Sequence, residues 1–88
     1  MAGDTLKGGA SMAVIKRSTQ DFEKVAHTTM EVLGKAGREW GGLTAWGCYL
    51  VKSWNCGCSV HYNLVLENGY IELALCPQHE NIIQNALE

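Results

Sequence analysis

The stretch CGCSVHYNLVLENGYIELALCPQH, residues 56–79, decides the fold of this chain. It opens on Cys56-Gly57-Cys58 and closes on Cys76-Pro77-Gln78-His79, with seventeen residues between the two groups. Three thiols and one imidazole are donor types that fill the corners of a tetrahedral zinc site. The spacing therefore predicts that Cys56, Cys58, Cys76 and His79 bind one structural Zn²⁺.

The residues between the two groups are typical of a β-hairpin. Apolar side chains alternate with polar ones from Val60 to Leu66, with Val65 as the exception, and Asn68-Gly69 is a strong signal for a tight turn. A second strand at 70–75 returns the chain to its starting point, which lets the two ligand pairs meet. Pro77 fits the first position of a short final helix, and this places His79 one turn into that helix.

The order of these parts over residues 55–87, namely a cysteine turn, a β-hairpin and a helix that supplies the last ligand, resembles a treble-clef zinc finger. The usual first turn is Cys-x-x-Cys-Gly, and Cys56-Gly57-Cys58 is one residue shorter. Because treble clefs serve many unrelated functions, the resemblance implies a scaffold and not an activity.

Three further side chains have ligand chemistry. Cys48 lies among aromatic residues, and we interpret it as a small buried hydrophobe that would replace Cys56 or Cys58 only if its strand ended nearby. His61 falls on the polar side of its strand, as an ordinary histidine or as a further ligand. His27 is expected on the surface of the first helix.

The chain before the hairpin predicts one helix and two strands. Residues 13–16 form a first strand, and an apolar stripe at helical spacing indicates an amphipathic helix over 19–36 with Ser18 as its N-cap. Gly41-Gly42 marks a turn, and 43–54 form a strand covered on both faces.

The predicted class is α+β: an N-terminal amphipathic helix on a three- or four-stranded antiparallel sheet, with a short C-terminal helix tied by the zinc site. We expect a single domain over 13–88. Residues 1–12 are expected to be a flexible leader or a remnant added for expression, with Met12 as the natural start.

Composition limits the class of protein. The chain has 88 residues, of which 47% are apolar and 18% charged, so its core is small and a metal would help to stabilise it. It has no apolar run long enough for a membrane span and no apolar segment of signal-peptide type, so we expect a cytoplasmic protein. Thiols stay reduced in that compartment, which favours metal binding over disulfides.

Charge and motifs bear on function. All seven Lys and Arg precede residue 53, whereas the remainder carries four glutamates, so nucleic acid is not expected to bind the zinc half. The chain contains no HExxH, zinc-deaminase or phosphate-loop motif, and no catalytic residues are predicted. Three tryptophans in so short a chain indicate exposed aromatic surface and a homo-oligomer formed through a sheet face or edge.

The function expected from these observations is a small non-enzymatic accessory module of bacterial or phage type, which is stabilised by zinc and binds another protein. One alternative is a nucleic-acid-binding zinc finger that uses a basic face of the first helix. The residues of that face are Lys16, Arg17, Lys24, Lys35 and Arg38. A second alternative is a small ligand-binding protein or enzyme with a pocket between helix and sheet.

Overall fold

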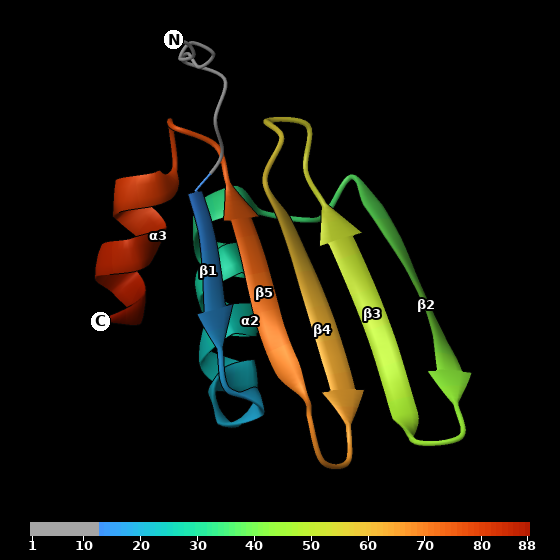
Figure 1. The fold of residues 1–88 in the computed structure, drawn as a ribbon. Helices are drawn as coiled ribbons and strands as arrows, with labels where there is room; N and C mark the ends of the chain where they lie inside the picture. The colour runs from blue at the N-terminus through green and yellow to red at the C-terminus, as the bar shows by residue number, and fades with distance from the viewer. Residues whose placement is uncertain (1–12) are drawn as a thin grey trace, which may run out of the picture.

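The computed structural model describes residues 13–88, and the predicted leader over 1–12 lies outside them. The fold is α+β, with one antiparallel five-stranded sheet and two α-helices (Figure 1). The sheet order is β1-β5-β4-β3-β2. The elements in chain order are β1 (Ala13–Arg17), a 3₁₀ turn (Thr19–Asp21), α2 (Phe22–Leu33), β2 (Arg38–Thr44), β3 (Gly47–Ser53), β4 (Ser59–Val65), β5 (Tyr70–Leu75) and α3 (Glu80–Leu87).

The first helix is shorter than the predicted span 19–36. The Ser18 hydroxyl accepts a hydrogen bond from the Gln20 amide at 3.1 Å, as an N-cap does, but the turn it opens is 3₁₀ and the α-helix begins at Phe22. The helix ends at Leu33, and its C-cap residue Gly34 has a φ of +81°, a left-handed conformation that glycine adopts without strain.

The sheet has five strands because the turn predicted at Gly41-Gly42 is wrong. Both glycines lie within β2, and the chain reverses after Thr44, whose hydroxyl accepts hydrogen bonds from the Trp46 and Gly47 amides. A Cβ at Gly41 would lie 3.2 Å from the Leu50 Cα and closer still to the Tyr49 carbonyl. Glycine is therefore needed for close approach between strands, and the predicted strand over 43–54 divides into the end of β2 and β3.

The predicted hairpin is confirmed as β4 and β5, whose register pairs Val60 with Leu73 and Tyr62 with Ile71. These four side chains are buried, and Val25 of α2 packs with them. Ile83 and Leu87 of α3 complete the core. The helices therefore bury the side of the sheet that carries the alternating apolar residues of the hairpin.

The helix layer covers only part of the sheet. In Figure 1, α2 lies behind β1 and β5, α3 lies beside β1, and β3 and β2 extend beyond both helices. At the end of the sheet where β2 turns into β3 and β4 into β5, Leu43, Trp46 and Leu66 are 89%, 70% and 86% exposed. We call these three residues the distal apolar patch. Neither α2 nor α3 is long enough to cross a membrane.

Candidate metal centre

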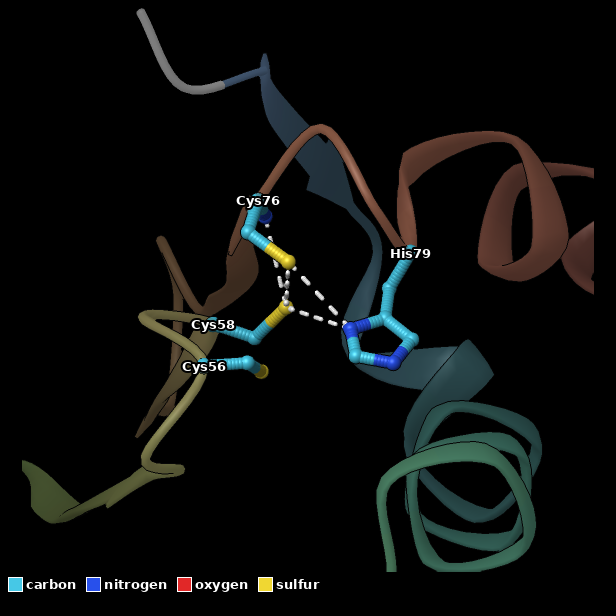
Figure 2. A group of neighbouring side chains, drawn as sticks. All are labelled: Cys56, Cys58, Cys76 and His79. Carbon is cyan, nitrogen blue, oxygen red and sulfur yellow. Dashed lines mark hydrogen bonds between the residues drawn. The ribbon is translucent and has the colours of Figure 1, made fainter. Parts of the chain in front are cut away.

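The four predicted ligands converge at one end of the sheet (Figure 2). Their ligand atoms all lie within 4.8 Å of one another. The Cys58 Sγ lies 3.5 Å from the Cys76 Sγ and 3.8 Å from the His79 Nδ1, and the Cys76 Sγ lies 3.2 Å from the same nitrogen. We call this group the Cys-His cluster, and its geometry is consistent with a bound metal ion.

A tight turn between β3 and β4 positions the first two cysteines. The Trp54 carbonyl accepts a hydrogen bond from the Gly57 amide at 3.0 Å, and the Trp54 amide donates to the Cys58 carbonyl at 2.9 Å. Gly57 has a φ of +104°, which residues with a side chain rarely adopt. This glycine reverses the chain between the two thiols, so that Cys56 and Cys58 approach the same point.

A second turn, after β5, positions Cys76 and His79. The Cys76 carbonyl accepts hydrogen bonds from the His79 and Glu80 amides at 3.1 and 3.0 Å, which wraps the chain back over the cysteine. The prediction that Pro77 opens the helix is wrong. Pro77 lies in this turn, α3 starts at Glu80, and His79 is its N-cap residue.

The two central thiols of the cluster differ in acidity. Burial raises the pKa of Cys58 to about 12. Burial alone would also raise the pKa of Cys76, but hydrogen bonds with the Cys58 thiol and with His79 lower it to about 7. A cation placed among these groups would favour the thiolate form of both, because opposite charge stabilises the ionised state.

No disulfide joins the cysteines of the cluster. All four cysteines of the chain are free, and the 3.5 Å between the Cys58 and Cys76 sulfurs is far longer than an S–S bond of about 2.05 Å. The Cys76 amide also donates to the Cys58 Sγ at 3.3 Å. Amide donors of this kind stabilise a thiolate, so the backbone supports the charge that a metal ligand carries.

Trp54 links the cluster to the first helix. Its side chain is 9% exposed, and its Nε1 donates to the Gly34 carbonyl at 2.9 Å, just beyond the end of α2. Sequence reasoning assigned no role to this residue. The only sequence feature that could have indicated a role for Trp54 near the cluster is its position two residues before Cys56.

The other three candidates lie away from the cluster. Cys48 is the second residue of β3, opposite Leu43 and Leu64, and lies at the other end of this strand from the turn that carries Cys56 and Cys58. His61 lies on β4 between Val51 and Glu72, with its ring 6.2 Å from that of Tyr70. His27 is exposed on α2, and its Nε2 lies 3.3 Å from a Glu31 carboxylate oxygen.

Comparison with known proteins adds no relative. No protein-family model, curated protein or solved structure matches this chain.

Proposed function

We propose that this chain is a non-catalytic protein-interaction module whose Cys-His cluster holds a structural zinc ion. The main support for the zinc site is the set of distances between the ligand atoms. Zinc bonds of about 2.3 Å to sulfur and about 2.0–2.1 Å to nitrogen, at tetrahedral angles, require S···S and S···N separations of about 3.8 and about 3.6 Å. The separations are 3.5 Å between the Cys58 and Cys76 sulfurs, and 3.8 and 3.2 Å from these sulfurs to the His79 Nδ1.

The donor set favours zinc in a structural role. Thiolates are soft ligands that select zinc over magnesium or calcium, and three of the four donors are cysteines. Four protein donors fill a tetrahedral shell and leave no position for a water or substrate. A reducing, cytoplasmic setting would keep the thiols available for the metal.

The surrounding elements support a treble-clef-like scaffold. The turn that carries Cys56 and Cys58 leads into the β4–β5 hairpin, and the chain then enters α3 through His79. A metal at the cluster would fasten three segments, since the turn at Trp54 also reaches Gly34. The metal would therefore stabilise the end of the sheet on which both helices depend.

The interaction role rests on the distal apolar patch. Small proteins seldom expose several large apolar side chains together unless another molecule covers them. Leu43, Trp46 and Leu66 are exposed in this way. The patch lies at the end of the sheet away from the cluster, where β2 and β3 turn (Figure 1). Zinc would thus hold the fold at one end, while the other end makes the contact.

The two alternatives gain less support. A basic helical face would need Lys35 and Arg38, but α2 ends at Leu33 and Arg38 lies in β2. Arg17 is engaged by the Leu87 carbonyl at 3.2 Å. The hollow between α2 and the sheet, lined in part by Met30 and Trp54, has a volume of about 190 Å³, which is below the roughly 300 Å³ of small-molecule sites.

Metal analysis of the purified protein tests the zinc proposal. We expect one zinc per chain, and we expect a strong chelator at neutral pH to abolish the dispersed amide spectrum, because zinc binding of about 10 kcal/mol or more matches the whole stability of a small domain. Re-addition of zinc should restore the spectrum. A native spectrum after complete metal removal would contradict the proposal.

A further inference from the structure

We propose that two copies of this chain pair through their β2 edges, antiparallel and about a two-fold axis at Gly41, to form one continuous ten-stranded sheet. The inference deepens the interaction role proposed above by naming the partner, and it does not depend on the metal. It rests on three features of β2: its unpaired backbone, its lack of edge protection and its complementarity to itself.

The two edges of the sheet differ. In the part of the chain that the structure describes, β1 and β2 are the outer strands, and each has one side of its backbone unpaired. The β1 edge carries Lys16 and Arg17, and α3 lies beside it, with the Arg17 guanidinium donating to the Leu87 carbonyl. Charges and a covering helix are devices that block strand addition.

No helix lies beside the β2 edge, and its charges are not all of one sign as they are on β1. Its sequence is Arg38-Glu39-Trp40-Gly41-Gly42-Leu43-Thr44, with two opposite charges at one end and no lysine or proline. Six of its seven residues are exposed, and Gly42 is partly covered. An unprotected edge with exposed apolar side chains is a template for another strand.

The strand is complementary to its own symmetry copy. Full antiparallel overlap of residues 38–44 places Gly41 opposite Gly41, Trp40 opposite Gly42, and Glu39 opposite Leu43 of the second copy. No like charges face each other in this register. Gly41 has no side chain on the helix side of the sheet, which leaves room for the neighbouring Leu43 of the second copy.

The same register gives Trp46 a place to bind. It brings the β2–β3 turn of one copy beside the α2–β2 connection of the other, because the paired strands run in opposite directions. A hollow of about 190 Å³ lies there, lined in part by Ala26, Met30 and Ala36. Met30 is 59% exposed in the single chain. Trp46 of each copy would then cover the hollow of the other, so the contact occurs twice in the dimer.

Sedimentation of the zinc-loaded full chain tests the pairing, with charge variants at one site. Leu43→Glu would face Glu39 of the second copy, whereas Leu43→Lys would face it with the opposite charge. Because symmetry repeats the contact, we expect the dimer dissociation constant to be at least about tenfold higher for Leu43→Glu than for Leu43→Lys. Val14→Glu, at a 62% exposed site on β1, is the control and should leave the dimer unchanged.

Each outcome decides the inference. A wild-type chain that is monomeric at concentrations on the order of 1 mM overturns it and leaves the β2 edge to an extended segment of another protein. Equal effects of the two Leu43 variants overturn the register, and a dimer that only Val14→Glu disrupts lies on β1. Zinc content and circular dichroism of every variant report the fold separately, so a monomer that retains zinc contradicts the dimer but not the proposed metal site.

Discussion

The two ends of the sheet differ in how tightly their residues are packed and hydrogen-bonded. At the end that carries the Cys-His cluster, the turns are closed by backbone hydrogen bonds, Cys58 is fully buried, and Trp54 ties the cluster to α2. At the other end, Leu43, Trp46 and Leu66 lie open to solvent. This difference supports the proposal that a metal stabilises one end of the sheet while the distal apolar patch contacts another molecule.

Substitution of a single metal ligand should have the largest effect on zinc binding and stability. The size of the effect should differ among the four ligands. Cys58 is fully buried at the centre of the cluster, whereas Cys56 is exposed. Cys58→Ser should abolish zinc binding and unfold the chain, since binding of about 10 kcal/mol or more is at stake. Cys56→Ser should keep the fold and bind zinc more weakly, because water can replace an exposed donor.

Zinc content and amide spectra of both variants measure this difference. A Cys58→Ser protein that retains zinc and the wild-type spectrum would show that Cys58 is not needed to bind the metal.

The pH dependence of zinc affinity should follow from the two unequal thiols. Burial raises the pKa of Cys58 to about 12, so zinc must displace its proton throughout the neutral range, and affinity should fall at least about tenfold for each pH unit of acidification. The pKa of Cys76 is about 7, so below that pH a second proton competes and the dependence should steepen to at least about a hundredfold.

Competition with a chelating indicator between about pH 6 and 9 measures the slope. The affinity rises with pH because the protons leave as the metal binds. A constant affinity over this range would mean that the thiols are not ligands.

Substitution of one glycine by alanine in β2 and of another in the cysteine turn adds a single methyl group to each region, so the two effects can be compared. Gly41→Ala brings a Cβ against the Tyr49 carbonyl and Leu50 and should destabilise the chain by about 1–3 kcal/mol. Gly57→Ala meets no atom within 4 Å but must adopt a φ of +104°, and should cost about 1–2 kcal/mol.

Chemical denaturation gives both values, and zinc affinity separates them. Only Gly57→Ala should weaken zinc binding, because only Gly57 lies between two ligands. A loss of zinc affinity in Gly41→Ala would mean that the two ends are not independent.

The smallest expected effect is at Trp54. Trp54→Phe retains an aromatic ring in the buried site but removes the 2.9 Å hydrogen bond from Nε1 to the Gly34 carbonyl. Loss of one such bond should cost about 1 kcal/mol. Hydrogen exchange should report the loss in the last turn of α2 and not in β2, and faster exchange confined to β2 would contradict the link between Trp54 and the helix.

The sequence was informative where the signal was local. Cys56, Cys58, Cys76 and His79 could be grouped because the hairpin between them has a clear turn at Asn68-Gly69, and a hairpin returns the chain to its start. The alternation of Val60 and Tyr62 with polar residues gave the buried side of β4 correctly. These features need only neighbouring residues to be recognised.

The sequence was ambiguous where one residue type serves two purposes. Gly41-Gly42 resembles a turn, but glycine is needed there because another strand passes close to the backbone. The real turn is held by the Thr44 hydroxyl, which carries little signal of its own. Trp54 acts through Gly34, twenty residues away, and no local pattern indicates such a contact.

X-ray absorption at the zinc edge tests the central claim most directly, because it reports the atoms bound to the metal. The account predicts three sulfur neighbours at about 2.3 Å and one nitrogen at about 2.0–2.1 Å, with no bound water. A shell composed mainly of oxygen atoms, or a purified chain that holds no zinc at all, would contradict it.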